Sequence, residues 1–286
     1  MLDRYGEDAK VLAGGQSLMA ALNMRLSAPR VLVDINGLTA LSGIRVDGRT
    51  ITIGALTRHR EVERSETIAE RLPLLHQAMP HVAHAAIRNR GTFGGSIAFA
   101  DPAAELPACA VALAATFRIA SSQGERTVRA ADFFKGLYET ALQPGEVLVA
   151  ADFPENAGGY RSVFQELARR HGDYPIVGLA AHAKVASSAL SDLRLVFFGA
   201  GETPMVARKA AAILERAPYS PALLAEAQAA LESELSPFGD AACSAATRTH
   251  LARVLLGRAA SQLLSATVLN PSPPTPLPKG EGRFET

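Results

Sequence analysis

The sequence predicts an α+β fold built from three consecutive blocks. In the first two blocks short apolar runs alternate with turns and helices, and in the third block three strands come before a series of helices. Strands followed by helices are typical of α+β modules. The chain has 286 residues, 48% of them hydrophobic, which is enough for a substantial core in one large or two modest domains.

The first block covers residues 10–54. Residues 10–13 have the composition of a strand that runs into Gly14-Gly15, and residues 31–35 are typical of a buried strand. Between them we predict a helix at residues 17–26, ended by Pro29, with an apolar stripe made of Leu18, Leu22 and Leu26. Residues 44–46 and 50–53 are predicted to form a hairpin around Asp47-Gly48.

The second block begins near Ala55. Thr57 is predicted to cap a helix that ends at Arg64, and further helices are expected at residues 69–79 and 107–115. Three strands are predicted: residues 116–120 paired with residues 126–129 around Gln123-Gly124, and residues 146–153.

The third block runs from residue 160 to residue 269. Residues 164–168, 176–185 and 190–198 are predicted to form a small antiparallel sheet. Helices are then expected at residues 206–216, 221–235 and 241–264. The tail, residues 270–286, is rich in proline and cannot bury apolar surface, so we predict that it is disordered.

The charge composition excludes several classes of protein. Lys and Arg number 29 against 28 Asp and Glu, so the net charge is +1 and there is no basic field of the kind that nucleic acid requires. The cluster Arg88-Asn89-Arg90 is more simply a solvated or locally paired surface than a phosphate site. No run approaches the ~18 apolar residues of a membrane span, and the N-terminus lacks the apolar core of a signal peptide. We therefore expect a cytoplasmic protein without a membrane span.

The cysteine and histidine content limits the possible redox centres. Cys109 and Cys243 are the only cysteines, so an iron–sulfur cluster, which usually takes four thiolates, cannot be built from this chain. His81 and His84 have helical spacing, but Pro80 interrupts that helix and no nearby acid or cysteine completes a metal site. A redox role would therefore depend on an organic cofactor.

Two segments with paired glycines are the most informative motifs. Ala13-Gly14-Gly15-Gln16-Ser17 joins a strand to a helix, where glycines permit a positive φ and the N–H groups can surround an anion such as a pyrophosphate. Thr92-Phe93-Gly94-Gly95-Ser96 repeats the pattern, with hydroxyls on either side of the glycines. Each segment alone is more often a tight turn than a ligand site, whereas the pair leaves a dinucleotide site and two turns equally open.

Three longer motifs resemble one protein family. They are Ala13-Gly14-Gly15-Gln16-Ser17-Leu18 with the strand at residues 31–35, the stretch from Arg90 to Ser96 with Asp101-Pro102-Ala103-Ala104-Glu105, and Ala168-Arg169-Arg170-His171-Gly172-Asp173-Tyr174. In this order they resemble the FAD-binding medium subunit of molybdenum hydroxylases, the family of aerobic carbon monoxide dehydrogenase and xanthine dehydrogenase. The motifs together span most of the chain.

The resemblance implies a fold and a domain organisation. The expected architecture is a two-subdomain FAD-binding fold of the PCMH (vanillyl-alcohol oxidase-like) type at residues 1–155, with subdomains at about 1–54 and 55–155. A small α+β C-terminal flavoprotein domain follows at residues 160–269. Family members usually have a strand and a helix before the position of Leu2; without them we expect exposed backbone and apolar surface near the adenine end.

The resemblance also implies the residues that contact FAD. The pyrophosphate would be held by Ala13, Gly14, Gly15, Gln16, Ser17 and Leu18 together with Thr92, Phe93, Gly94, Gly95 and Ser96. Asp101 and Glu105 would accept hydrogen bonds from ribityl or ribose hydroxyls, Leu148 would lie in the strand that passes the isoalloxazine, and Tyr174 would lie near the ring.

Each of these single residues also has a purely structural explanation. Asp101 can initiate a turn, Glu105 can satisfy a helix N-terminus, Leu148 can be core, and Tyr174 can be a turn aromatic. Two positions differ from the family: Ser96 stands where Asn is common, and Phe93 stands where a smaller aliphatic is usual.

The functional hypothesis that follows is an FAD-dependent electron-transfer subunit. Its partners would be a large subunit with a molybdenum cofactor and a small iron–sulfur subunit, as a dimer of heterotrimers, with electrons passing to an external acceptor. No catalytic or metal-binding residue is assigned, because the cofactor supplies the chemistry. The alternatives are a self-sufficient FAD-dependent oxidoreductase and a truncated, non-catalytic remnant.

Overall fold

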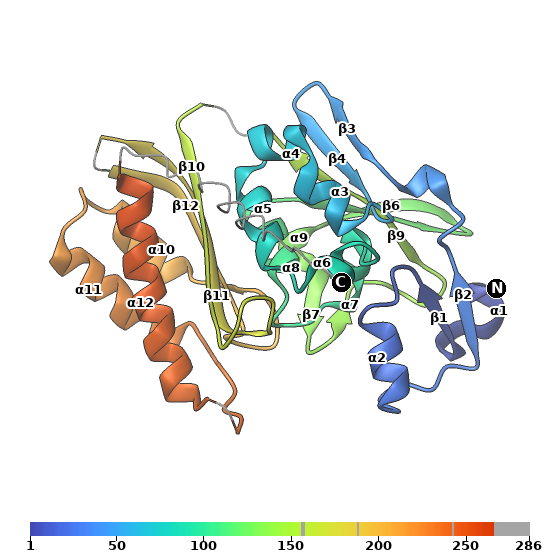
Figure 1. Cartoon of the computed structure of the whole chain (residues 1–286). Helices are drawn as coiled ribbons and strands as arrows, with labels where there is room; N and C mark the ends of the chain where they lie inside the picture. The colour runs from blue at the N-terminus through green and yellow to red at the C-terminus, as the bar shows by residue number, and fades with distance from the viewer. Residues whose placement is uncertain (156–157, 188, 242, 266–286) are drawn as a thin grey trace, which may run out of the picture.

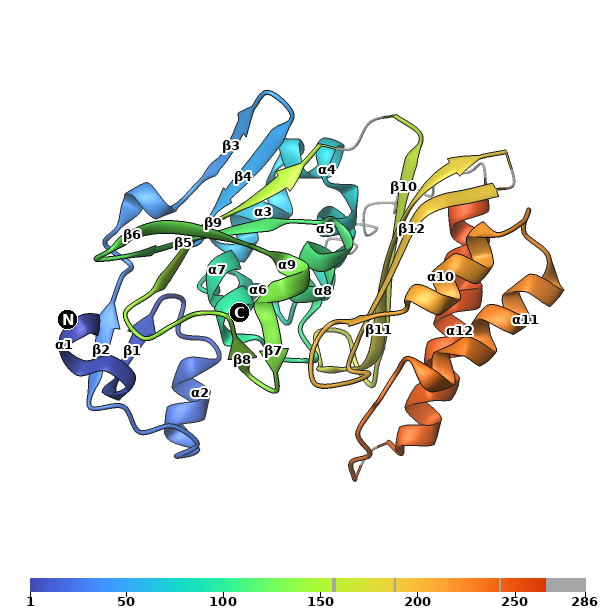
Figure 2. The ribbon, with the colours of Figure 1, turned by 180° about the vertical axis from the view of Figure 1, so that it is seen from behind.

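The computed structural model describes residues 1–155, 158–187, 189–241 and 243–265. The predicted disordered tail, residues 270–286, lies outside the described residues. Figures 1 and 2 show a small N-terminal unit at one end of the molecule, a five-stranded sheet with helices in the middle, and a second sheet covered by helices at the other end. This mixture of helices and antiparallel sheets confirms the predicted α+β class.

The N-terminal unit contains two parallel strands that pair from Ala9↔Val31 to Leu12↔Asp34. Its elements are α1 (Leu2–Tyr5), η1 (Gly6–Asp8), β1 (Ala9–Leu12), α2 (Leu18–Asn23), β2 (Val31–Asp34) and η2 (Thr39–Leu41). Both predicted strands are confirmed.

The predicted stripe on the first helix is wrong. α2 ends at Asn23, and Arg25 has a φ of 58°, a left-handed conformation that an α-helix cannot contain. Leu26 therefore lies beyond the helix, with 74% of its surface exposed, and none of residues 18–23, all of them described, is buried.

The five-stranded sheet is antiparallel throughout, in the order β3-β4-β9-β5-β6. Its strands are β3 (Ile44–Asp47), β4 (Thr50–Gly54), β5 (Thr116–Ser121), β6 (Gly124–Arg129) and β9 (Val147–Pro154). The predicted hairpins and the strand at residues 146–153 are confirmed. A short two-stranded ladder, β7 (Phe134–Gly136) with β8 (Glu139–Thr140), lies beside α9 (Ala130–Phe133).

Helices pack against this sheet and form the main core with it. They are α3 (His59–Arg64), α4 (Glu66–Arg71), α5 (Pro73–Ala78), η3 (Met79–His81), α6 (Ala85–Arg88), α7 (Phe93–Phe99) and α8 (Glu105–Ala112). Every residue of α8 is buried, which identifies it as the central helix of this core.

Two helix predictions in this region need correction. Thr57 is not a helix cap: its Oγ1 pairs with the N–H and the carbonyl of Gly43, at 2.9 and 3.1 Å, and α3 begins at His59. The helix predicted at residues 69–79 is two helices, because Pro73 cannot donate a backbone hydrogen bond inside a helix and instead starts α5.

The C-terminal part contains an antiparallel sheet in the order β10-β11-β12-β13, as predicted. The strands are β10 (Tyr160–Ala168), β11 (Pro175–Ala186), β12 (Ala189–Phe198) and β13 (Met205–Val206); the helices are α10 (Arg208–Glu215), α11 (Pro221–Ala230), η4 (Leu231–Ser233) and α12 (Ala245–Leu264). One face of the sheet packs with these helices in a second apolar cluster. The other face contributes Phe164, Ala180, Val196 and Phe198 to the main core, so the two sheets are joined by a shared apolar interface.

Candidate cofactor site

The first glycine motif is an open loop between β1 and α2. Gly15 has a φ of 73°, which glycine adopts without the strain that a Cβ would cause. The backbone N–H groups of residues 14–17 donate to no acceptor in the described parts of the chain, and the Gln16 side chain donates to the Gly14 carbonyl at 3.1 Å. A run of free amides at a left-handed glycine is a cradle suited to an anion such as a pyrophosphate.

The second glycine motif is the first turn of α7 rather than a loop. Thr92 caps this helix: its Oγ1 accepts from the Gly95 N–H at 3.1 Å. The N–H groups of Phe93 and Gly94 donate to the carbonyls of Thr57 and Ala55, at 2.9 and 2.8 Å, and the Ser96 N–H donates to the Thr92 carbonyl. Most amides of this motif are thus already paired, in contrast to those of the first motif.

The glycines of the second motif serve close packing. A Cβ at Gly94 would overlap the Ala55 methyl group, and one at Gly95 would lie 2.7 Å from the Thr92 hydroxyl. Neither glycine has a positive φ. Ala55 and the turn of α7 can therefore approach each other only if residue 94 has no side chain.

The structure brings the two glycine motifs into direct contact. A Cβ at Gly14 would overlap the Arg90 carbonyl oxygen and lie 2.8 Å from Gly91 Cα and 3.0 Å from the Thr92 nitrogen. The free amides of residues 14–17 therefore lie beside the hydroxyl-bearing start of α7. The two motifs, far apart in the sequence, thus form one composite candidate site.

His59 is a residue of this site that the sequence did not reveal. Its backbone N–H donates to the Gly91 carbonyl at 3.0 Å, and its Nε2 lies 2.9 Å from the Thr92 carbonyl. Burial lowers the pKa of His59 to about 4, so the ring is neutral near pH 7 and its Nε2–H donates to Thr92. No local pattern signals this role, because the partners of His59 lie in a distant part of the sequence.

The acidic residues predicted near the ribityl chain follow directly after α7. Asp101 Oδ1 accepts from the Ala103 N–H at 2.9 Å, which is the turn geometry considered above, and burial raises its pKa. Burial also raises the pKa of Glu105, the first residue of α8, to about 8. Near pH 7 the Glu105 carboxyl is therefore mainly protonated and can donate a hydrogen bond, whereas the resemblance implied an acceptor.

Two tyrosines lie close to these acids. Desolvation raises the pKa of Tyr174, and the negative charges of Asp101 and Glu105 raise it further. Tyr174 is 69% exposed, so most of its surface is free for a ligand. Tyr138, which the sequence did not single out, packs edge-on against Phe99 at 5.2 Å, and its pKa is raised by desolvation and by Asp101. The structure thus gathers Asp101, Glu105, Tyr138 and Tyr174 near the end of α7.

The side chains of two other predicted residues belong to the core. Leu148 is 4% exposed and pairs with Ile119 across the β5–β9 ladder. Phe93 is fully buried, with its ring edge-on to Phe153 at 6.0 Å. The bulkier Phe93 is accommodated because it faces this core.

Two clusters of charged residues have local partners. Arg88 forms a bidentate pair with Glu63, at 2.9 and 3.0 Å, which confirms the locally paired interpretation of Arg88-Asn89-Arg90. His81 does have an acidic neighbour, contrary to expectation, since its Nδ1 lies 3.2 Å from the buried Glu166 of β10.

Within the described ranges no group of three or more His, Cys, Asp or Glu side chains could hold a metal ion. In the same ranges no helix is long and apolar enough to cross a membrane.

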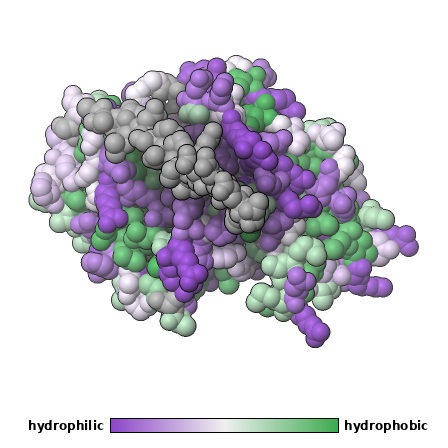
Figure 3. Space-filling model, in the orientation of Figure 1, coloured by the Kyte–Doolittle hydropathy of each residue, from purple (hydrophilic) through white to green (hydrophobic). Residues whose placement is uncertain are grey.

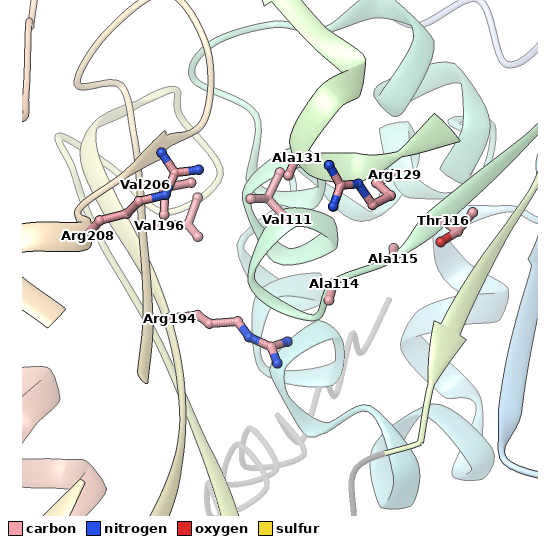
Figure 4. A pocket seen from close by; sticks show the side chains of 10 residues that line it. All are labelled: Val111, Ala114, Ala115, Thr116, Arg129, Ala131, Arg194, Val196, Val206 and Arg208. Atoms are coloured by element: carbon pink, nitrogen blue, oxygen red, sulfur yellow. The ribbon is translucent and has the colours of Figure 1, made fainter. Parts of the chain in front are cut away.

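A separate pocket of about 280 Å³ lies between α8 and β5 on one side and β12 and β13 on the other. Figure 4 shows the side chains that line this pocket, which are mostly apolar but include three arginines. The lining residues are Val111, Ala114, Ala115, Thr116, Arg129, Ala131, Arg194, Val196, Val206 and Arg208. Arg129 pairs with Asp132 at 2.7 Å and Arg194 with Asp192 at 2.9 Å. None of the predicted cofactor residues lines this pocket, so it is distinct from the glycine motifs.

Two protein-family models match the chain. Residues 1–156 match the FAD binding domain in molybdopterin dehydrogenase. Residues 162–263 match the CO dehydrogenase flavoprotein C-terminal domain.

Characterised relatives match over nearly the whole chain. The 6-hydroxypseudooxynicotine dehydrogenase complex subunit alpha of Paenarthrobacter nicotinovorans is 40% identical over 91% of this chain and 88% of its own length. The carbon monoxide dehydrogenase medium chain of Afipia carboxidovorans is 33% identical over 91% of this chain and 90% of its own.

Solved structures match the fold equally well. A chain of carbon monoxide dehydrogenase from Hydrogenophaga pseudoflava superposes with a TM-score of 0.89 at 34% identity, covering 92% of this chain and 91% of that one. A chain of quinoline 2-oxidoreductase from Pseudomonas putida 86 gives a TM-score of 0.84 at 37% identity, over 90% and 91%. These matches show that the chain belongs to the FAD-binding medium subunits of the molybdenum hydroxylases and is an FAD-dependent oxidoreductase subunit.

Proposed function

We propose that the chain binds FAD across its two glycine motifs and passes electrons through it within a molybdenum hydroxylase complex. The observation that carries this proposal is the run of free amides at residues 14–17, which begins at the contact between Gly14 and Gly91. Amides without an acceptor beside a left-handed glycine suit a pyrophosphate, because they offer several donors to one anion. When bound, FAD supplies the exchange between one-electron and two-electron carriers.

The residues of the site have distinct proposed roles. The amides of residues 14–17 bind the pyrophosphate, and the hydroxyls of Ser17, Thr92 and Ser96 are available as further donors. Glu105, protonated below about pH 8, donates to a sugar or ribityl oxygen, and Asp101 accepts from a hydroxyl. The exposed Tyr174 covers an aromatic ring by stacking. Leu148 and Phe93 contribute through the backbone, since their side chains are core.

The partners we propose are a large subunit with a molybdenum cofactor and a small iron–sulfur subunit, as a dimer of heterotrimers. Two observations support this. Relatives are named as a medium chain and as a complex subunit, and a matching carbon monoxide dehydrogenase structure is described as lacking the Mo-pyranopterin moiety of the molybdenum cofactor. The two cysteines of this chain are too few for an iron–sulfur cluster. Electrons would arrive from clusters on the small subunit and leave to an external acceptor.

We also propose that residues 1–155 and 160–269 are separate domains. The two apolar clusters support this division, because the second contains only residues from Val163 onwards in the described ranges. The cytoplasmic location remains a prediction from the sequence.

The visible spectrum tests the proposed function. We expect oxidised-flavin bands in the chain purified alone, and co-purifying molybdenum and iron–sulfur subunits after co-expression with the neighbouring genes. An active flavoprotein that needs no partner would instead favour a self-sufficient oxidoreductase. A colourless protein without partners, even when FAD is added, would contradict the proposal and favour the non-catalytic remnant.

A matched pair of glycine variants tests the location of the site. In Gly14→Ala the new methyl group would overlap the Arg90 carbonyl and separate the two motifs. In Gly37→Ala the new methyl group has no atom within 4 Å, so this variant is the control. We expect Gly14→Ala to weaken FAD binding at least about tenfold, as the loss of one or two hydrogen bonds to a charged group would. Gly37→Ala should bind as the parent does. Equal affinities of the two variants in a fluorescence titration would place the FAD elsewhere.

A further inference from the structure

The N-terminal segment, residues 1–40, has little apolar attachment to the rest of the protein. All of its residues are described, and Ala9 and Ile35 are its only buried apolar side chains. Its exposed large apolar side chains are Met1, Met19, Met24, Leu26, Leu32 and Leu38. In Figure 3 green atoms gather at the lower right, where Figure 1 places α2. A segment that buries so little apolar surface depends on polar contacts for its position.

A chain of hydrogen bonds supplies such contacts. Asn36, which follows β2, donates from Nδ2 to the Ala13 carbonyl at 2.8 Å and accepts at Oδ1 from Arg58 Nη2, also at 2.8 Å. Arg58 Nη1 donates to the Arg90 carbonyl. One guanidinium therefore connects Ala13, through Asn36, with Arg90, which lies two residues before the second motif.

The main chain of Arg58 is itself fixed to the second motif. Arg58 and Thr92 form an antiparallel bridge, and the Arg58 N–H donates to Glu61 Oε2 at 2.7 Å at the start of α3. The side chain thus extends from a rigid base beside α7 towards the loosely attached segment. The neighbouring Arg60 is different: it is exposed, and its Nη1 reaches Asn89 Oδ1 at 3.3 Å.

We propose that Arg58 and Asn36 form a latch that sets the distance between the two glycine motifs, and that Arg58 is a positioning residue for the FAD site. Because Asn36 holds the Ala13 carbonyl, the latch orients the free amides of residues 14–17 without touching the cofactor. The positioning role rests on the proposed function. The latch itself is independent of the proposed function, because its hydrogen bonds form within this chain without a cofactor.

The geometry requires arginine at position 58. Two nitrogens of one planar guanidinium serve two separate acceptors, Asn36 Oδ1 and the Arg90 carbonyl. A lysine ammonium is a single point on a shorter side chain and cannot reproduce that fork. Arg58→Lys should therefore behave like Arg58→Ala, and a small soluble guanidinium compound should partly restore the alanine variant.

Hydrogen exchange of the full chain without FAD tests the latch. We expect Arg58→Ala and Arg58→Lys to speed amide exchange in residues 9–18 and 31–36 and to leave β4 and β9 unchanged. Arg60→Ala, which removes an arginine two residues further along the chain, should have no effect in either region. Unchanged exchange at residues 9–18 in both Arg58 variants would overturn the latch, and unchanged β4 and β9 show that the variants are folded.

FAD titration of the same proteins tests the positioning role. The affinity should fall about tenfold in both Arg58 variants, in keeping with the loss of charge-assisted hydrogen bonds, and should recover in Arg58→Ala when ethylguanidinium, but not sodium chloride, is added. Faster exchange with undiminished affinity would overturn the positioning role and leave the latch standing. Failure of the parent chain to bind FAD would instead overturn the proposed function, while the exchange data would still decide the latch.

Discussion

At the scale of single residues, burial determines the protonation of the groups that surround the site. Desolvation raises the pKa of Glu105 to about 8 and lowers the pKa of His59 to about 4. Away from the site, in β11 of the C-terminal sheet, desolvation also lowers the pKa of His182 to about 4. The two histidines are thus neutral where the acid is protonated. Near pH 7 the buried part of the site carries neutral hydrogen-bond donors, which limits the cost of keeping these groups away from water.

These shifts predict the pH dependence of stability. Glu105 has a higher pKa in the folded state, about 8, than its ordinary 4.5, so its contribution is complete below pH 4.5 and is lost as the pH rises to 8. The histidines act in the opposite direction, but only between about pH 4 and 6.5. The interval from pH 6.5 to 8 therefore isolates Glu105 among these three groups, with a maximal slope of about 1.4 kcal/mol per pH unit.

We expect Glu105→Gln to flatten the decline of stability in that interval, because glutamine keeps the shape of the protonated acid and does not titrate. Urea unfolding at several pH values measures the effect. Glu70→Gln, at an exposed position of α4, serves as the control and should decline as the parent does. Parallel curves for the parent and Glu105→Gln would show that Glu105 is ionised in the folded protein.

At the scale of elements, α7 connects the two ends of the site. Its first turn lies against the loop of the first glycine motif, and Asp101 follows shortly after its last residue, Phe99. The Thr92 cap fixes where the helix begins. The cap therefore has a role in positioning the site as well as in stabilising the helix.

A comparison of two helix caps separates these roles. Thr92 Oγ1 accepts from Gly95 N at 3.1 Å in α7, and Ser220 Oγ accepts from Leu223 N at 3.2 Å in α11, far from the site. Replacing either by alanine should lower the free energy of unfolding by ~1 kcal/mol, the usual value of an N-cap. FAD affinity should fall in Thr92→Ala alone and return in Thr92→Ser. If Thr92→Ala and Ser220→Ala bound FAD equally well, the Thr92 cap of α7 would have no part in FAD binding.

At the scale of the whole molecule, an apolar interface and several polar contacts, among them those of one glutamine, hold the C-terminal sheet against the central part. β10 is an edge strand of the C-terminal sheet, and an open edge leaves backbone groups unpaired. Gln77 of α5 pairs with two of them: its Oε1 accepts from Phe164 N at 2.9 Å and its Nε2 donates to the Ser162 carbonyl at 3.1 Å. Gln77 thus imitates a neighbouring strand and fixes the C-terminal sheet against the helices.

We expect Gln77→Ala to lower the free energy of unfolding by ~1–3 kcal/mol, because two backbone groups of β10 lose their partners at a buried interface. Gln262→Ala is a suitable control, since Gln262 is exposed and its side chain accepts only from Gln165 Nε2, at 2.9 Å, in the described structure. Its cost should be at most a few tenths of a kcal/mol, as for most surface substitutions. Similar denaturation midpoints for the two variants would contradict this role of Gln77.

Much of the fold was predictable because its signals are local. The hairpin at Asp47-Gly48, the strand pair around Gln123-Gly124 and the three long C-terminal strands follow from alternating apolar residues and turn residues close in sequence. Boundaries were less predictable where a local preference competes with packing. Thr57 has the residue type of a cap, but its hydroxyl is taken by Gly43.

The sequence by itself determined the α+β class, the order of strands and helices, the family and the two glycine motifs, because these depend on residue spacing within short stretches. The tertiary structure decided that Gly14 lies against Gly91, that Arg58 connects the two motifs, and that no residue of the predicted stripe on the first helix is buried. These features depend on contacts between residues far apart in the chain. Such contacts form only when the chain folds, so no pattern within a short stretch of sequence predicts them.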